Sequence, residues 1–225
     1  MESLLSVDNA LALAAKVKHL PEKLQKKALR YGMFGAFFFR GLCLLFASYA
    51  IQHKEFKFAG AIYLIWLSIS HFRQKREEEV GKKASKKTPG FFMTVVAVEL
   101  LDLALSIDNI FASVAISDQK WIVVTGVCIG IIAMRFVAGW FCKLLERFPA
   151  LETSAYVIIL LLGIKLLLSF MIDMGNHYYP GTVVSNTEMI LKSEYFEYGF
   201  SILTMLIFVL PLLSKRNSPI KSVAP

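Results

Sequence analysis

A short motif, Ser-x-Asp-Asn, occurs twice in this 225-residue chain, at positions one hundred residues apart. The first copy is Ser6-Val7-Asp8-Asn9 and the second is Ser106-Ile107-Asp108-Asn109. An acid precedes each aspartate by six residues, Glu2 in the first copy and Asp102 in the second. The flanking residues are apolar, and an ionisable group within an apolar membrane segment is costly and indicates a functional site by default. The duplication suggests that two halves of the chain build one site between them.

The oxygen-bearing side chains around both motifs suit a hard divalent cation. Carboxylate and amide oxygens are the ligands preferred by Mn²⁺, Mg²⁺ and Ca²⁺, whereas softer metals prefer thiolate and imidazole. The four histidines and three cysteines show no spacing typical of a metal site or a disulfide framework. The predicted metal ligands are Glu2, Asp8, Asn9, Glu99, Asp102, Asp108 and Asn109.

Enzymatic chemistry has little support in the sequence. We find no phosphate-binding loop, no nucleophile–base pair and no zinc signature. We therefore expect a protein that is not an enzyme and that binds no permanent cofactor, the metal ion being cargo.

The second motif must be positioned by the apolar segment 90–117. On a continuous helix Glu99, Asp102, Ser106 and Asn109 share one face, because they follow steps of three and four residues. Asp108 then points about 120° away from Asp102. Either the motif lines a broad interior surface or the helix unwinds near Ser106, and no Gly or Pro lies between residues 91 and 120 to mark a break.

The composition predicts an all-α polytopic membrane bundle of about seven transmembrane helices. Hydrophobic residues make up 56% of the chain, above the roughly 45–50% of soluble domains. A helix needs about 17–25 apolar residues to cross a bilayer. The segment Glu2–Ala15 would rise only about 21 Å. We expect a further segment upstream, the alternative being a first helix that spans half the bilayer, and we expect no signal peptide. The other predicted helices lie at 31–51, 58–72, 90–117, 121–142, 153–172 and 195–213.

The basic residues separate by side when seven spans are assumed. Eighteen of the 25 Lys and Arg fall in the loops 16–30, 73–88 and 143–152 or in the tail after residue 213, and four fall on the opposite side. This positive-inside bias predicts an external amino terminus and a cytoplasmic carboxyl terminus. The net charge of +8 is explained by these loops, so we expect a multi-pass protein of the plasma or inner membrane, with the lipid bilayer and no nucleic acid as partner. The sequence neither predicts nor excludes a homo-oligomer.

The two motifs then lie on helices of opposite direction, which predicts two inverted three-helix repeats plus a last helix. A second matching pattern supports the repeat, since Gly35 precedes Arg40 by five residues and Gly130 precedes Arg135 by five. The predicted organisation is repeat one at about 1–72, a cytoplasmic linker at 73–88, repeat two at 89–172, an external loop at 173–194, the last helix at 195–213 and a cytoplasmic tail at 214–225.

Three cations, Arg40, Arg135 and Lys165, fall inside predicted spans and need partners. For the arginines two alternatives stay open. They form fixed salt bridges between helices, or they neutralise the acids while the site is empty and yield when a cation arrives. Lys165 either pairs with an acid or extends toward the membrane interface.

Several segments together resemble the TerC family of integral membrane proteins. The resemblance rests on Ser3–Leu13, Glu99–Asn109, Met134-Arg135-Phe136 and Leu144–Glu152, and it covers roughly residues 2–172. It implies a seven-helix protein related to a superfamily of exporters. The family is named for tellurium resistance, and its bacterial members are implicated in manganese efflux. It also implies that the acidic motif positions named above as metal ligands are functional.

We therefore predict a transporter that exports a divalent cation, Mn²⁺ being favoured, through an acidic site between the first and fourth helices. Asp8 and Asp108 are the expected principal ligands, with Asn9 and Asn109 completing the shell. One alternative is an exporter of a small organic cation or amino acid that uses the same acids as counter-charges. Another is a membrane scaffold that does not transport, linked to metal or tellurite stress, whose buried charges specify helix packing.

Overall fold

A computed structural model describes residues 7–45, 55–80, 89–116, 120–178 and 193–213 of the chain. Within these residues the protein forms seven α-helices and no strand, which confirms the predicted all-α class. The helices are α2 (Val7–Val17), α3 (Glu22–Leu45), α5 (Glu55–Glu79), α6 (Phe91–Ile116), α7 (Lys120–Arg147), α8 (Ala150–Tyr178) and α10 (Glu194–Leu213).

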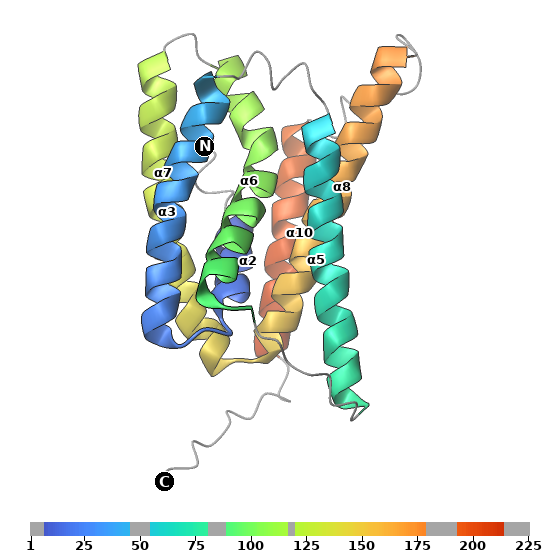
Figure 1. Ribbon diagram of the computed structural model, residues 1–225. Helices are drawn as coiled ribbons and strands as arrows, with labels where there is room; N and C mark the ends of the chain where they lie inside the picture. The colour runs from blue at the N-terminus through green and yellow to red at the C-terminus, as the bar shows by residue number, and fades with distance from the viewer. Residues whose placement is uncertain (1–6, 46–54, 81–88, 117–119, 179–192, 214–225) are drawn as a thin grey trace.

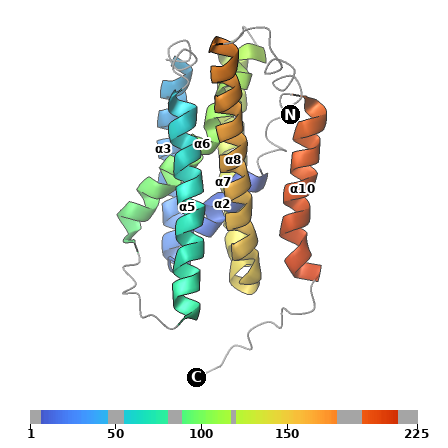
Figure 2. The same cartoon turned by 90° about the vertical axis from the view of Figure 1, so that its right-hand side faces the viewer.

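The long helices lie alongside one another, and successive helices run in opposite directions (Figure 1). Helix α5 packs along α8, and α3 packs against both α6 and α7. The shorter α2 packs chiefly against α6, α7 and α8, while α10 packs against α8. In the turned view α10 stands at the edge of the bundle and α2 crosses its interior at a slant (Figure 2).

Several helices extend past the apolar stretches that predicted them. Helix α3 begins at Glu22, within the predicted loop 16–30, and α5 continues to Glu79, within the predicted linker 73–88. Helix α8 continues to Tyr178, within the predicted external loop. The added turns of α3 and α5 are rich in Lys, Glu, Gln and Arg, which form helices well but lower the hydropathy. Apolar runs therefore mark only the central part of each helix.

The short helix α2 forms the centre of the core. Every residue from Ala10 to Ala15 is at most 3% exposed, and Val17 is fully buried. A helix that is apolar on all sides is expected to be surrounded by other elements. Because most of these side chains are alanine or leucine, α6, α7 and α8 can pack closely around α2.

The outer surface of the bundle is apolar. Phe34, Phe38, Trp66, Phe92 and Phe136 are each between 61% and 83% exposed. Large exposed apolar areas of this kind mark contact with a membrane or a partner. Within the described residues, two stretches are long and apolar enough to cross a bilayer. These are Thr125–Arg147 and Ala150–Gly175, with mean hydropathies of 1.8 and 2.5.

Helices α5 and α8 approach closely at Gly163. A Cβ atom at this position would lie 3.0 Å from Leu64 Cβ and 3.1 Å from the backbone nitrogen of Ile65. Small residues at such contacts let helix backbones come together, as is typical of helix packing within membranes.

Candidate functional site

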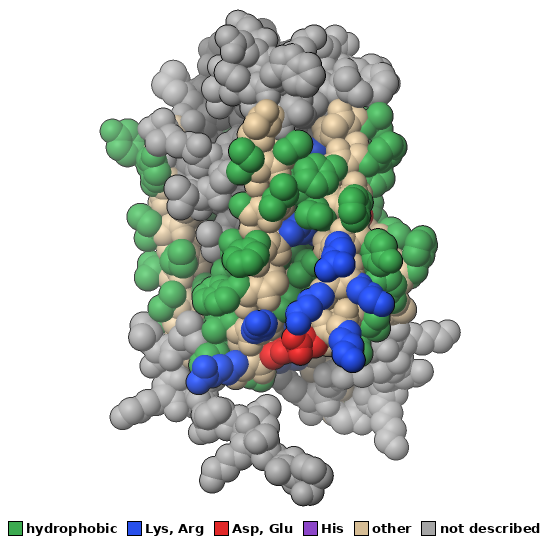
Figure 3. Space-filling model, turned by 90° about the vertical axis from the view of Figure 1, so that its left-hand side faces the viewer, with side chains coloured by type: hydrophobic (Ala, Val, Ile, Leu, Met, Phe, Trp, Pro, Cys, Tyr) green, Lys and Arg blue, Asp and Glu red, His purple; other side chains and the backbone are tan. Residues whose placement is uncertain are grey.

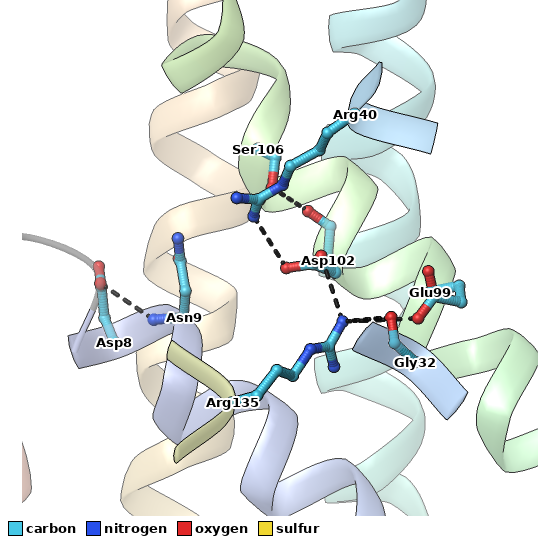
Figure 4. A network of polar contacts seen from close by, with 8 residues as sticks. All are labelled: Asp8, Asn9, Gly32, Arg40, Glu99, Asp102, Ser106 and Arg135. Atoms are coloured by element: carbon cyan, nitrogen blue, oxygen red, sulfur yellow. Dashed lines mark hydrogen bonds and ion pairs between the residues drawn. The ribbon is translucent and has the colours of Figure 1, made fainter. Parts of the chain in front are cut away.

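The carboxylate of Asp102 lies at the centre of a buried charged cluster (Figure 4). Asp102 is on α6 and is 2% exposed. Arg40 of α3 donates from Nη2 to its Oδ1 at 3.1 Å, and Arg135 of α7 donates from Nη2 to its Oδ2 at 3.3 Å. One acid thus connects three helices, α3 from the first predicted repeat and α6 and α7 from the second.

Glu99 lies one turn before Asp102 on α6, against a notch in α3. Arg135 Nη2 donates to Glu99 Oε1 at 3.5 Å and to the backbone carbonyl of Gly32 at 3.0 Å. A Cβ atom on Gly32 would lie 2.8 Å from Glu99 Oε1, and a Cβ on Gly35 would overlap the Glu99 side chain. The two glycines are three residues apart, so they share a helix face and leave room for the carboxylate.

The structure also resolves the two alternatives for α6 near Ser106. The helix is continuous from Phe91 to Ile116. The buried Ser106 hydroxyl donates to the backbone carbonyl of Asp102, four residues earlier, and accepts a hydrogen bond from Arg40 Nη2. Serine can bond back to the preceding turn in this way without ending a helix. Of the two alternatives left open by the sequence, the structure has the continuous helix, and the described polar side chains project from it.

The first copy of the motif lies at the start of α2. Asp8 Oδ1 accepts a hydrogen bond from the backbone nitrogen of Asn9 at 3.0 Å. This carboxylate sits in the first turn, where a negative charge is favoured by the helix dipole. The side chain of Asn9 is buried, with 6% of its surface exposed. In Figure 4 Asn9 lies between Asp8 and Asp102, so the Asp8 carboxylate is farther from Asp102 than the Asn9 side chain is.

The remaining predicted site residues have different positions. Glu2 lies outside the described residues. Asp108 and Asn109 belong to α6, two to three residues beyond Ser106, and their side chains also lie outside the described part. Lys165 of α8 is apart from the cluster, with its ammonium 5.0 Å from the ring centroid of Phe200 on α10. This is cation–π geometry, which links α8 to the last helix.

The charges of the described cluster cancel. Arg40 and Arg135 contribute two positive charges, and Glu99 and Asp102 contribute two negative ones. Arg40 Nε and Arg135 Nε and Nη1 are buried without an acceptor among the described residues. In the same part of the chain no three His, Cys, Asp or Glu side chains are grouped so that they could hold a metal ion. The cluster described is thus an arginine–carboxylate network.

Polar contacts also join the helices near the α2–α3 turn. Lys18 forms an ion pair with Glu152 in the first turn of α8. His19 lies with Nε2 3.0 Å from the hydroxyl of Thr94 near the start of α6. Gln25 Nε2 donates to the backbone carbonyl of Leu20 at 2.8 Å and to Glu146 of α7 at 2.9 Å. We call Lys18, His19, Gln25, Thr94, Glu146 and Glu152 the basal cluster.

A further ion pair lies toward the opposite end of the bundle. Lys57 of α5 donates to Asp173 of α8 at 2.9 Å, and its exposed fraction is 8%. Ser169, one turn before Asp173, lies 3.4 Å from the same ammonium. The sequence did not reveal this pair, since hydropathy placed both charged residues in loops. Gly32 was missed as well, although its spacing from Gly35 is a signal for a small-residue helix face.

Comparison with known proteins gives the family. The model of the integral membrane protein TerC family matches residues 1–218. The chain is 45% identical over 172 residues to the uncharacterized membrane protein YceF of Bacillus subtilis, which covers 74% of this chain and 67% of that protein. It is 39% identical over 187 residues to the uncharacterized membrane protein YkoY of the same organism, covering 75% of this chain and 57% of YkoY.

A more distant relative is the chloroplastic thylakoid membrane protein TERC of Arabidopsis thaliana. It is 25% identical over 203 residues, which is 76% of this chain and 52% of that protein. The matched region of YkoY is less than two thirds of its length. No solved structure matches the chain. The family match covers nearly the whole sequence and agrees with the family and membrane location predicted from the motifs, so this chain belongs to the TerC family of integral membrane proteins.

Proposed function

We propose that this protein exports a divalent metal cation, with Mn²⁺ as the favoured cargo, through a site between α2 and α6. The observation that carries the proposal is the Asp102 carboxylate, 2% exposed and contacted by two arginines, inside a protein of an integral membrane family. Ionisable residues are rarely placed within a membrane protein without a role in moving charge.

The charge balance indicates how a cation would be accommodated. The two arginines already neutralise Glu99 and Asp102. The two remaining negative charges of the repeated motif, on Asp8 and Asp108, would cancel the charge of one divalent cation. We propose that Asp8, Asp108 and the two motif asparagines bind the ion. Arg40 and Arg135 form ion pairs with Glu99 and Asp102 while the site is empty, and these pairs rearrange when the ion binds. The arginine donors that lack acceptors among the described residues favour such a rearrangement, since an unpaired buried donor is costly.

We further propose that the polytopic bundle is an inverted repeat. Exchanging α2, α3 and α5 with α6, α7 and α8 maps the α2–α7 contact onto α6–α3, and the α5–α6 contact onto α8–α2. The α5–α8, α3–α7 and α2–α6 contacts map onto themselves. The two triplets run in opposite directions (Figure 1). Rocking of one repeat against the other would expose the site to each side in turn, with the amino terminus outside and the carboxyl terminus in the cytoplasm of a plasma or inner membrane.

The test is the metal content of cells that lack or overproduce the protein, measured for Mn, Mg, Ca, Fe and Zn. Overproduction should lower one divalent metal, and Asp8→Asn or Asp108→Asn should abolish the change. Glu22→Gln is the matched control, because Glu22 is an exposed acid paired only with a neighbouring lysine in the structure described. An unchanged content of all five metals would exclude the proposal.

A second candidate function is a membrane scaffold that does not transport. One observation supports it, namely that Glu99 and Asp102 are already paired with arginines. In that case Asp8→Asn and Asp108→Asn would reduce the yield of folded protein and leave metal content per cell unchanged. Measuring both quantities for the same variants separates the two functions.

A further inference from the structure

The first turns of α3 carry four basic residues on the outside of the bundle. Lys23, Lys26, Lys27 and Arg30 are all exposed. Their spacing of three, one and three residues places them on one side of the helix. Figure 3 shows basic side chains gathered at the lower end of this face, with apolar side chains above them.

The helix continues from this basic side into exposed aromatic residues. Tyr31, Phe34 and Phe38 are 56%, 62% and 65% exposed. Tyr31 follows Lys27 by four residues and Phe34 follows Arg30 by four, so each aromatic ring lies one turn above a cation on the same side. The change from cationic to aromatic residues occurs within a single turn. In a membrane protein, such a change marks the boundary between headgroups and hydrocarbon.

Helix α7 adds to the positive charge of this surface. Lys143 and Arg147 are exposed in its last turns, and α7 packs against α3. Glu22 pairs with Lys26 at 2.8 Å, and the pKa of Glu22 is lowered first by Lys26 and further by the charge of Lys143. Two exposed acids, Glu22 of α3 and Glu146 of α7, lie among six exposed cations on these helix ends, so the surface keeps an excess of positive charge.

Helix α5 provides a comparison within the same molecule. It also passes from exposed apolar residues, Trp66 and Ile69, to exposed basic residues, Arg73 and Arg76. There, however, the run Glu77-Glu78-Glu79 follows immediately and balances the cations. The two helix ends thus share their geometry and differ in net charge.

We propose that the basic side of α3, formed by Lys23, Lys26, Lys27 and Arg30, binds the headgroups of anionic phospholipids. The exposed aromatic residues one turn above the cations favour a lipid as the ligand. A lipid can contact the cations with its headgroup and the rings with its acyl chains, whereas a soluble anion can contact only the cations. Basic residues near a membrane surface attract anionic lipids, and the effect of one residue corresponds to about a fivefold change in binding. This inference rests on membership of an integral membrane family and not on the proposed transport, so either can fail alone.

The experiment uses the full chain in a neutral detergent, titrated with dioctanoyl phosphatidylglycerol. Bound lipid is counted by native mass spectrometry, and the melting temperature is followed by circular dichroism. Phosphatidylglycerol should bind and raise the melting temperature, while dioctanoyl phosphatidylcholine and inorganic phosphate should have much smaller effects. Lys27→Gln with Arg30→Gln should weaken phosphatidylglycerol binding on the order of tenfold.

Two matched variants complete the design. Arg73→Gln with Arg76→Gln removes two cations at the same spacing from α5 and should leave binding within about twofold of wild type. Lys27→Arg with Arg30→Lys keeps the charges and should bind normally. Equal losses from the α3 and α5 pairs, equal binding of the two lipids, or an equal effect of inorganic phosphate would each overturn the inference.

Discussion

At the scale of single residues, Asp102 differs from the other acids because two arginines from two helices contact its two oxygens. Glu99 contacts only Arg135, at the longer distance of 3.5 Å. Removing one partner of a buried ion pair leaves an uncompensated charge, and the loss is about 3–5 kcal/mol in known cases.

We therefore predict that Asp102→Asn destabilises the protein by about 3–5 kcal/mol and Glu99→Gln by clearly less. The isosteric amides preserve shape, so the difference reports the charge. Thermal unfolding of both variants in the same detergent measures the effect. Equal stability of the two variants would show that Asp102 does not organise the cluster.

The glycine notch leads to a second prediction. Gly35→Ala should cost about 1–3 kcal/mol, because a Cβ atom there would displace the Glu99 side chain. Gly41→Ala is the control on the same helix, since a Cβ atom at residue 41 would meet nothing within 4 Å in the structure described. The control should stay within about 1 kcal/mol of wild type, because alanine favours helix. If Gly41→Ala proves more destabilising than Gly35→Ala in unfolding measurements, the packing of Glu99 against Gly35 does not limit stability.

Sequence reasoning recognised the charged residues of the cluster but not its shape. Arg40, Arg135 and Asp102 are conspicuous because they interrupt apolar runs, and charge in an apolar setting is visible without a structure. The role of Gly32 depends on where a side chain from another helix lies, and this information is absent from local sequence. The Lys57–Asp173 pair was missed because the apolar stretches 58–72 and 153–172 end just short of these two residues. Both were therefore assigned to loops, whereas the structure has them within α5 and α8.

At the scale of helices, the basal cluster couples the α2–α3 turn to three other elements. Lys18 reaches α8, His19 reaches the start of α6, and Gln25 reaches α7. His19 lies in the turn between helices and keeps part of its surface exposed. Its pKa is lowered from the ordinary value of 6.5 by partial desolvation first and then by the charge of Lys16. The folded protein thus favours the neutral imidazole.

A pH dependence follows from this shift. Since the unfolded chain binds a proton at His19 more readily, the associated stability is complete above about pH 6.5 and declines as the pH falls below that value. We predict that the melting temperature of the wild type drops between pH 7.5 and pH 5.5 and that His19→Gln reduces this drop. An identical pH profile for both proteins would show that His19 is not responsible.

At the scale of the whole molecule, the two predicted repeats are joined at three levels. The basal cluster links the α2–α3 turn to α8 at one end, the Arg40–Asp102 pair links α3 to α6 in the middle, and the Lys57–Asp173 pair links α5 to α8 toward the other end. The described conformation therefore has polar contacts along the whole boundary between the repeats. Any rocking of one repeat against the other must break contacts at one end.

Helix α2 also constrains the order in which the bundle can assemble. Its eleven described residues span about 16 Å, roughly half of a bilayer's hydrocarbon core. Nearly all of them are covered by α6, α7 and α8, which are synthesised after it. Helix α2 thus lacks its main packing partners until α6, α7 and α8 have been made. Packing around α2 is therefore a late step of folding that depends on the later part of the chain.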